Sequence, residues 1–374
     1  MRIAVLTSSR ADYGIYRPLL QLLSRAEDVE LELVVFGTHL SRFHGYTIDE
    51  IRKDGYEPFV CIDSMSMGDT PGAIASAMGN TMIQFSGYWA GASGRIDLAV
   101  CLGDRYEMFA AVSSSIPFNV PVAHIHGGET TLGAMDNIFR HSLSHMATLH
   151  FVATQAYANR LEELVGSSEH VFHVGALSLD SLAHFKPYSA AEFRQQFDLD
   201  VDDGTILVTL HPETKRPEDT ERQVDVLAEV LENQQEWKAL ITMPNADTAG
   251  TVIRERMKKL NAEHPKRFQL AENLGQRGYF SAIALGAFLM GNSSSGIIEA
   301  ASFDKYVINI GERQAGRISG KNVINVPFDA AALEAAMKRV AQNGSQRFEN
   351  PYFVGGAAER ILEGMRAFLK NDGS

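Results

Sequence analysis

The stretch LAVCLGDRYE, residues 98–107, decides the fold class, because an apolar run of strand length ends abruptly in Gly, Asp and Arg. The same pattern recurs in VAHIHGGE (122–129), in ILVTLHPE (206–213) and in AFLMGNSSSG (287–296). In open α/β sheets, ligands bind at the carboxyl ends of the strands. We therefore expect these polar turns to contribute to one composite site, and such a site favours an enzyme over a scaffold protein.

Strand-like runs alternate with helical patterns along most of the chain, which predicts parallel sheets covered by helices on both faces. The alternation pauses at Leu182–Asp203, and we place an interdomain linker near Ala176–Tyr188. The sequence thus predicts an α/β protein with two Rossmann-like domains, at residues 1–180 and 181–355, that face each other. A last helix, within residues 356–374, could pack back on the N-terminal domain, although its pattern fits either domain.

Each expected strand is a short run rich in Val, Ile, Leu and Phe, and one expected helix has a clear stop signal in Gly166. The expected helices include Tyr16–Ser24, Ile74–Trp89 and Ala156–Leu164. The expected strands are Ile3–Leu6, Leu31–Phe36, Phe59–Ile62, Leu98–Leu102, Val122–Ile125, His150–Val152, Val171–Val174, Ile206–Leu210, Ala239–Thr242, Phe268–Leu270, Ala287–Met290 and Val307–Ile310.

Composition narrows the classes of partner. A chain of 374 residues is too long for one typical core, which agrees with two domains, and its formal net charge of -12 argues against a nucleic-acid partner. Cys61 and Cys101 lie in apolar strand-like runs, so we expect them to be buried packing residues. No apolar stretch is long enough to span a membrane, and no signal peptide precedes the first strand, so we expect a cytoplasmic protein.

The sequence carries no signature of a bound cofactor. TSSR (7–10) follows the first strand, where a dinucleotide-binding domain has Gly-x-Gly-x-x-Gly. Gly311–Arg317 has the glycine spacing of a phosphate loop but lacks the Lys and Ser/Thr that hold phosphate and magnesium. No His-Glu-x-x-His or nearby cysteine accompanies the paired histidines, so we expect structural or hydrogen-bonding roles for them and no metal. The pairs that share a face are His124 with His126 and His141 with His145.

The segment Gly291–Gly296 predicts a phosphate site. It follows a strand-like run and precedes a helical one, where small residues let the backbone approach a ligand and free amides face an anion. A helix N-cap would explain one serine but not Asn292, Ser293 and Ser294 together, so we favour phosphate binding. Glu299, one turn further on, could reach a ribose diol or could simply interact with the helix dipole.

Three acids of the first half are candidates for catalysis. Asp104 and Glu129 follow adjacent strand-like runs, and Asp136 precedes a helical stretch. Asp136 could instead be an N-cap, and Asp104 could form a salt bridge with Arg105. Carboxylates that crowd together shift one another's pKa, which is how one can act as an acid while another acts as a base. The three acids together therefore favour catalysis.

Positive charge near the same turns suits an anionic ligand. His211 stands alone at a strand end before Pro212, where it could reach a bound phosphate. Each arginine taken singly is most simply a surface residue, but five of them neighbour the polar turns, which suits a pyrophosphate. They are Arg10, Arg105, Arg140, Arg313 and Arg317.

Taken together, these residues resemble the hydrolysing UDP-N-acetylglucosamine 2-epimerase family of sialic and legionaminic acid biosynthesis. The resemblance covers most of the chain in family order and implies a glycosyltransferase-B-like architecture. Two Rossmann-like domains would flank an interdomain cleft, the C-terminal one binding the nucleotide. The matching segments are SRADYG (9–14), GDRYE (103–107), HIHGGE (124–129), RHS (140–142), HPET (211–214), NSSSGIIE (292–299) and GERQAGR (311–317).

The resemblance also implies a two-stage reaction. UDP leaves the anomeric carbon while C2 loses a proton, which gives a glycal; water then adds across the double bond, with the C2 proton on the opposite face. N-acetylmannosamine and UDP are released, and electrostatic support of the departing pyrophosphate should dominate. By position, the catalytic residues would be Asp104, Glu129, Asp136 and His211. The residues that bind the UDP-sugar would be Arg10, Arg105, Arg140, Asn245, Asn292, Ser293, Ser294, Glu299, Arg313 and Arg317.

Two positions depart from the family pattern, and several alternatives stay open. Asn137 stands where some members carry an acid, and Ile15 where some carry Lys. The same chemistry on UDP-2,4-diacetamido-2,4,6-trideoxy-glucose, or on a GDP-linked analogue, fits the motifs equally well. A glycosyltransferase would need an acceptor, and a non-catalytic sugar-nucleotide sensor would need no acids. Besides the UDP-sugar we expect no nucleic-acid or membrane partner, but we do expect a homo-oligomer, either a dimer or a tetramer.

Overall fold

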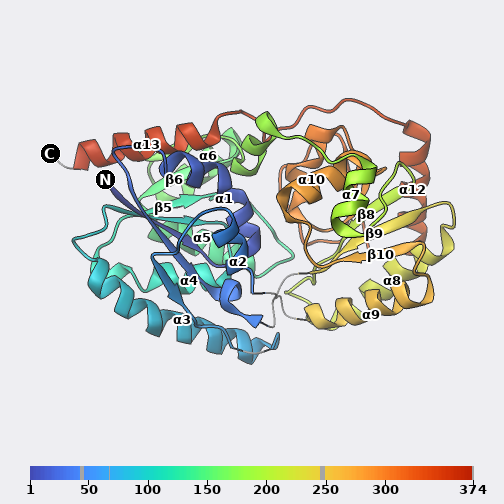
Figure 1. The fold of residues 1–374 in the computed structure, drawn as a ribbon, viewed down its shortest axis with the longest axis horizontal. Coiled ribbons are helices and arrows are strands. Elements are labelled where there is room, and N and C mark those ends of the chain that lie inside the picture. Colours follow the sequence, from blue (N-terminus) through green and yellow to red (C-terminus); the bar gives the residue numbers. More distant parts are fainter. Residues whose placement is uncertain (43–45, 67, 245–248, 373–374) are drawn as a thin grey trace. The chain divides into compact units, whose positions relative to one another are not determined.

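The computed structural model describes residues 1–42, 46–66, 68–244 and 249–372, and it forms two compact units (Figure 1). Each unit is built on one parallel β-sheet with helices, which confirms the expected α/β class with two Rossmann-like parts, as in glycosyltransferase-B-like proteins. The first unit comprises Met1–Glu129, Asp136–Ala183 and Tyr352–Ser374, and the second comprises Thr130–Met135 and His184–Pro351.

The sheet of the first unit has seven strands in the order β3-β2-β1-β4-β5-β6-β7. Neighbouring strands are parallel throughout, as expected for strands joined by crossover helices. The strands are β1 (Arg2–Thr7), β2 (Glu30–Phe36), β3 (Val60–Ile62), β4 (Leu98–Leu102), β5 (Val122–Ile125), β6 (Leu149–Val152) and β7 (Val171–His173). The helices are α1 (Arg10–Leu23), α2 (Ile48–Lys53), α3 (Pro71–Ala92), α4 (Tyr106–Ser113), α5 (Asp136–Met146), α6 (Gln155–Val165) and α13 (Ala357–Asp372).

Alternate residues of the strands fill two cores, one on each face of this sheet. Ile3 and Val5 of β1 belong to a core that includes side chains of α1, α2 and α13. Ala4 and Leu6 point to the opposite face and pack in a core with side chains of α3, α4 and α5. Burial on both faces explains why these strands are continuous apolar runs.

The C-terminal helix α13 belongs to the first unit although it follows the whole second unit in sequence. Ile361, Met365 and Phe368 of α13 are buried in the core that also contains β1. The carboxylate of Asp180 accepts hydrogen bonds from the amides of Ala357 and Ala358 and so satisfies two free amides of the first turn. The chain therefore returns to the first unit through packing as well as through a capped helix start.

The sheet of the second unit has six parallel strands in the order β10-β9-β8-β11-β12-β13. Strand β8 packs through Ile206, Val208 and Leu210 in a core with side chains of α8, α9 and α12. The strands are β8 (Thr205–Thr209), β9 (Lys238–Thr242), β10 (Phe268–Ala271), β11 (Leu289–Gly291), β12 (Val307–Ile310) and β13 (Val323–Val326). The helices are α7 (Ala190–Phe197), α8 (Thr220–Asn233), α9 (Gly250–Glu263), α10 (Gly275–Leu285), α11 (Ser294–Ile298) and α12 (Ala330–Asn343).

The structure differs from the sequence predictions at several points. Cys101 is buried as expected, but Cys61 is exposed on the short edge strand β3, so the prediction that both cysteines are buried was wrong for Cys61. Helix α1 begins at Arg10 rather than near Tyr16, because Ser9 and Asp12 form a capping box at its start. The edge strand β13 was not predicted, since it is only half-buried and lacks a fully apolar run. The helical run predicted at Ile297–Ser302 is not one continuous helix: α11 ends at Ile298, and a short 3-10 turn follows at Ala300–Phe303. The stop signal in Gly166 is confirmed, because this glycine ends α6 in the left-handed conformation.

Among the helices of the described residues, none is both long enough and apolar enough to cross a bilayer.

Candidate active site

Acidic side chains stand at the carboxyl ends of two neighbouring strands of the first unit. Strands β4 and β5 pair in parallel and therefore end at the same edge of the sheet. Asp104 follows β4 after Gly103, whose φ of +80° lets the chain turn sharply. Glu129 lies in the turn after β5, and Asp136 is the first residue of α5. All three predicted acids thus belong to this unit.

A buried arginine connects two of these acids. Arg140, on α5 and only 3% exposed, forms an ion pair with Asp104, and its Nη1 lies 3.6 Å from Oε2 of Glu129. The same Nη1 donates a hydrogen bond of 2.8 Å to the main-chain carbonyl of His126. A guanidinium stays protonated in proteins, so Arg140 offsets part of the negative charge that Asp104 and Glu129 bring together.

The turn after β5 also carries a histidine in contact with Glu129. Nδ1 of His126 lies 2.7 Å from Oε1 of Glu129, and the imidazole is almost fully buried. Gly128 has a φ of +74°, and a Cβ at this position would lie 2.6 Å from the carbonyl oxygen of Tyr157. The glycine allows the turn to pack against α6, which places both ends of the His126–Glu129 hydrogen bond.

His124, two residues earlier, connects the turn that carries Asp104 to α5. Its Nε2 lies 2.8 Å from the carbonyl oxygen of Gly103, and its Nδ1 lies 3.1 Å from the hydroxyl of Ser144 on α5. Burial lowers the pKa of His124 to about 3, so the ring is neutral near pH 7. Because a carbonyl can only accept, the single ring proton is on Nε2. His124 therefore has the structural, hydrogen-bonding role that the sequence indicated.

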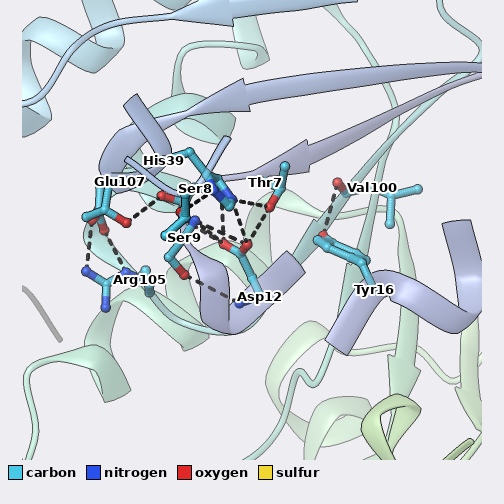
Figure 2. Close-up of polar contacts among 11 residues, drawn as sticks. Thr7, Ser8, Ser9, Asp12, Tyr16, His39, Val100, Arg105 and Glu107 are labelled. Carbon is cyan, nitrogen blue, oxygen red and sulfur yellow. Dashed lines mark hydrogen bonds and ion pairs between the residues drawn. The ribbon is translucent and has the colours of Figure 1, made fainter. Parts of the chain in front are cut away.

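The β1–α1 turn is held by polar contacts among Thr7, Ser8, Ser9 and Asp12 (Figure 2). Helix α1 then begins at Arg10. The carboxylate of Asp12 accepts hydrogen bonds from the amide of Ser8 at 2.9 Å and from the hydroxyl of Thr7 at 2.5 Å. Nε2 of His39 lies 2.9 Å from the same hydroxyl. Burial alone would raise the pKa of Asp12, but its contacts with His39, Thr7 and Ser8 lower it below the usual value. The turn is thus built around an ionised carboxylate.

Arg105 pairs with an acid that the sequence analysis did not single out. Its Nε and Nη2 donate to the two carboxylate oxygens of Glu107 at 3.1 and 2.9 Å. Glu107 is fully buried, and the pair appears in Figure 2 beside the β1–α1 turn. Asp104 forms its ion pair with Arg140, so the alternative of a salt bridge to Arg105 is not the arrangement found.

In the second unit, an asparagine shapes the turn after β8. Oδ1 of Asn292 accepts a hydrogen bond of 2.7 Å from the amide of His211, and Nδ2 donates one of 2.8 Å to its carbonyl. Asn292 is fully buried, so its side chain fixes the backbone of His211. Gly291, with a φ of +137°, would place a Cβ only 1.9 Å from the carbonyl oxygen of Thr209, so no other residue fits between β11 and β8.

The serines that follow have different surroundings. The hydroxyl of Ser293 accepts a hydrogen bond from the amide of Ser295 and caps α11, and Ser294 is the first helical residue. The hydroxyl of Ser295 contacts both Glu299 and the hydroxyl of Tyr279 at 2.8 Å. Glu299 ends this short helix rather than standing one turn inside it. Ser293, one of the two serines predicted to bind phosphate, is thus also the N-cap of α11.

A second buried acid, Glu213, holds the loop after β12. Its Oε1 accepts hydrogen bonds from the amides of Glu312 and Arg313, and its Oε2 accepts one of 3.1 Å from Gln223. These loop amides are the donors that a phosphate loop would offer to a ligand, and here a carboxylate of the protein binds them. The side chain of Arg313 donates to the carbonyl of Asn292 at 3.2 Å.

The segment Thr130–Met135 belongs to the second unit although both of its sequence neighbours belong to the first. The amide of Leu132 donates to the carbonyl of Ala315, and the amide of Gly133 donates to that of Glu312, both at 3.0 Å. A Cβ at Gly133 would lie 2.5 Å from the Glu312 carbonyl oxygen, so the two backbones meet directly. Glu129 and Asp136 are therefore separated by a stretch that packs on the loop after β12.

The structure thus gathers the predicted residues into two groups, each described within its own unit. The first unit contains Asp104, Glu129, Asp136, Arg10, Arg105 and Arg140, and the second contains His211, Asn292, Ser293, Ser294, Glu299, Arg313 and Arg317. Asn245 lies outside the described residues. The direct contacts join Asp104 and Glu129 to Arg140, and join Asn292 to His211 and Arg313.

Several buried polar residues of these networks were not among the predicted site residues, among them Asp12, Glu107, His126 and Glu213. For Asp12 a signal existed, because Ser9 three residues earlier is the start of a capping box. Glu213 and Glu107 stand in the same polar turns as predicted residues, two positions after His211 and Arg105. Their positions in these turns could have made both residues candidates, but no local sequence pattern indicated which atoms they bind.

The part of the chain that the structure describes contains no group of three or more His, Cys, Asp or Glu side chains arranged to hold a metal ion.

Two Rossmann-like units, one with a buried cluster of carboxylates, arginine and histidine, define a glycosyltransferase-B-like α/β protein. A family model described as UDP-N-acetylglucosamine 2-epimerase matches residues 21–366. The chain is 33% identical over 364 residues to the UDP-N,N'-diacetylbacillosamine 2-epimerase (hydrolyzing) of Legionella pneumophila, covering 97% of this chain and 94% of that protein. It is 30% identical over 345 residues to the GDP/UDP-N,N'-diacetylbacillosamine 2-epimerase (hydrolyzing) of Campylobacter jejuni, covering 91% and 89%.

Among solved structures, the UDP-GlcNAc 2-epimerase from Neisseria meningitidis bound to UDP-GlcNAc has the same fold. The TM-score is 0.81 at 16% identity, over 98% of this chain and 100% of that chain. With the family model matching most of its length, the chain belongs to the UDP-N-acetylglucosamine 2-epimerase family.

Proposed function

We propose that this protein is a hydrolysing 2-epimerase that converts UDP-N-acetylglucosamine to N-acetylmannosamine and UDP. In the first stage the C1–O bond breaks, its electron pair leaves with UDP, and the C2–H electron pair becomes the double bond of a glycal. In the second stage water adds its oxygen to C1, and a proton returns to C2 from the opposite face. Both stages need proton transfer to and from carbon, so the site must contain acids and bases held close together.

The observation that carries this proposal is the buried cluster in the first unit. Asp104 and Glu129 share Arg140, and Glu129 also binds His126. Carboxylates and an imidazole in contact can divide the roles of proton donor and acceptor among themselves. A sensor that only binds a sugar nucleotide has no need for such a cluster, and burying these charges costs free energy that binding alone would not require.

The second unit supplies candidate contacts for UDP. We assign phosphate binding to Ser293, Ser294, His211 and Arg313, and ribose binding to Glu299, which neighbour one another at the ends of β8, β11 and β12. A pyrophosphate that leaves with an electron pair is stabilised by fixed hydrogen-bond donors and by arginine. Arg10, Arg105, Asn245 and Arg317 complete the set proposed to contact the substrate.

A second substrate is favoured by the relatives. Two of them, at 33% and 30% identity, are named as hydrolysing 2-epimerases of N,N'-diacetylbacillosamine nucleotides. That sugar has the same C1 and C2 groups as N-acetylglucosamine and differs at C4 and C6, so the same acid–base cluster would act on it. The reaction class therefore stands for both substrates, and the choice depends on contacts to C4 and C6.

The test is NMR of the purified protein in deuterated water, with each of the two UDP-sugars and without acceptor or metal. Free N-acetylmannosamine with deuterium at C2 and an equal amount of UDP would support the first substrate. Release of UDP from UDP-N,N'-diacetylbacillosamine alone would keep the mechanism and change the substrate. If neither sugar releases UDP, the proposal is wrong, and a glycosyltransferase or a sensor becomes the better description.

A further inference from the structure

The imidazole of His126 has a position that packing alone does not explain. It follows the carboxyl end of β5 directly and is only 5% exposed. Its backbone φ of +65° lies in the left-handed region, which a side chain with a Cβ rarely adopts because the conformation costs free energy. Residues kept in that region without glycine are concentrated at functional sites. The left-handed backbone therefore indicates a functional role for the side chain of His126.

The contacts of His126 fix where its ring proton lies. Nδ1 is 2.7 Å from Oε1 of Glu129, and an ionised carboxylate can only accept, so the proton of the neutral ring is on Nδ1. Nε2 then carries a lone pair. This atom is buried and has no hydrogen-bond partner among the described residues. A buried lone pair without a donor is costly unless something else uses it.

Arg140 holds the rest of this arrangement in place. Its Nη1 donates to the main-chain carbonyl of His126 at 2.8 Å and lies 3.6 Å from the second oxygen of Glu129. One guanidinium therefore fixes both the backbone of the histidine and the carboxylate that orients its ring. The hydrogen-bonded pair His126–Glu129 is called the dyad below. Because Arg140 also pairs with Asp104, the dyad belongs to the same cluster as the predicted acids.

We propose that His126 is the base that removes the C2 proton in the first stage, and that Glu129 orients the ring and stabilises the imidazolium. The proposal rests on the epimerase function proposed above. The proton moves from C2 to Nε2, the C2–H electron pair becomes the C1=C2 bond, and the C1–O electron pair leaves with UDP. Glu129 then acts on the histidine, as the acid of a Ser-His-Asp triad does, and not directly on the sugar.

Imidazole suits this task because it is a base near neutral pH that needs only a small environmental change to match the reaction. A carboxylate at Nδ1 stabilises the imidazolium that forms when Nε2 takes the proton, since the new positive charge lies next to a negative one. The histidine was absent from the predicted catalytic set because its spacing indicated no metal and gave no other signal.

The experiment is chemical rescue of His126→Gly. Glycine accepts the left-handed backbone without strain and leaves space for a free imidazole, so the variant should fold. We expect kcat to fall about 100- to 10,000-fold, the usual worth of a general base, with the Kd for UDP within about twofold of wild type. Added imidazole should restore turnover in proportion to its unprotonated fraction. The rescued rate should be slower with substrate deuterated at C2.

The matched control is Asn119→Gly, which also replaces a left-handed residue (φ +53°) at an exposed position of the same unit. Its turnover should equal that of wild type and should not respond to imidazole. A His126→Gly variant that folds and turns over at the wild-type rate would overturn the proposal. Loss of turnover without any imidazole response would also overturn it, because that pattern indicates a structural role.

A second measurement separates this proposal from the proposed function. Proton NMR of the wild-type protein should show a strongly downfield Nδ1–H signal that disappears in both His126→Gly and Glu129→Gln. Its absence in wild type would overturn the dyad whether or not the protein is an epimerase. If the signal is present but wild type turns over neither UDP-sugar, the epimerase function is wrong, and the assigned proton transfer is overturned with it.

Discussion

The two sheets end in polar networks of different kinds. In the first unit the network joins charged groups to one another: Asp104 and Glu129 to Arg140. In the second unit polar side chains bind mainly backbone: Asn292 holds both main-chain groups of His211, and Glu213 holds two loop amides. Charged side chains in contact can exchange protons, whereas side chains bound to backbone fix the shape of a loop. We therefore propose that the first edge carries the chemistry and that the second edge places the ligand.

Asp104→Asn is the substitution with the largest expected effect on the first unit's network. An amide of the same shape can still accept a hydrogen bond from Arg140 but carries neither charge nor an exchangeable acid proton. We expect kcat to fall about 100- to 10,000-fold while the Kd for UDP stays within about twofold. UDP release and calorimetric UDP binding measure the two effects separately. The exposed Asp63→Asn is the control, and full turnover of the Asp104 variant would remove this acid from the mechanism.

His124, in β5 of the first unit, allows a test that depends on pH. Burial lowers the pKa of His124 from 6.5 to about 3, so the unfolded chain binds the proton more readily than the folded one. The contribution of the neutral His124 ring to the free energy of unfolding is therefore complete above the pKa of this histidine in the unfolded chain. It is lost as pH falls from about 6.5 toward 3. Between pH 8 and pH 5 we expect wild type to lose about 2 kcal/mol more unfolding free energy than His124→Gln.

Denaturant unfolding at several pH values measures this difference. Glutamine can still donate to the Gly103 carbonyl, so the variant should keep the contact and lose only the titration. The exposed His145→Gln should behave as wild type over the same pH range. Parallel pH curves for wild type and His124→Gln would mean that this edge is not held by a buried neutral imidazole.

Glu213→Gln tests the second edge. One carboxylate oxygen faces the amides of Glu312 and Arg313, and the other faces the amide nitrogen of Gln223. A glutamine must therefore point a donor at a donor on one side, which costs about 1–3 kcal/mol. If this loop places Arg313 for UDP, the Kd for UDP should rise about 10-fold with kcat at saturating substrate nearly unchanged.

The control for this variant is the double exchange Glu213→Gln with Gln223→Glu. In the double variant the new amide can donate to the new carboxylate and keep its oxygen toward the loop, so UDP binding should recover. An unchanged Kd in the single variant would separate this loop from the nucleotide. A fall in kcat instead would mean that both edges take part in the chemistry, and the comparison would fail.

Much of the fold was predictable, because buried parallel strands are continuous apolar runs that end in glycine or polar turns. Strands such as Leu98–Leu102 and Val122–Ile125 were predicted with the bounds found. The half-exposed β13 and the start of α1 were not, since the first lacks a full apolar run and the second depends on a side-chain cap. The place of Thr130–Met135 in the second unit depends on tertiary backbone hydrogen bonds, for which a sequence has no local signal.

The candidate site was predictable as a set of positions but not as a set of contacts. Asp104 and Glu129 could be predicted because they follow strand ends. The ion-pair partner of Asp104 could not, because it is Arg140, 36 residues away, rather than its neighbour Arg105. His126 could not be nominated, because its role depends on one left-handed residue and one hydrogen bond. Pairings across elements are decided by packing, and a single sequence does not encode them locally.

The serine pair at α11 gives the smallest expected effect and the finest test of the second edge. Ser293 caps the helix, so Ser293→Ala should lower the unfolding free energy by about 0.5–2 kcal/mol. Ser294 is the first helical residue and caps nothing there, so Ser294→Ala should leave stability nearly unchanged. If its hydroxyl binds phosphate, the Kd for UDP should rise about 5-fold, as expected for loss of about 1 kcal/mol from one hydrogen bond. Thermal unfolding and calorimetry on both variants separate the two roles. Both hydroxyls are proposed to bind phosphate, so weaker binding in only one variant would remove the other serine from the phosphate site, and unchanged binding in both would leave UDP recognition to His211 and the arginines.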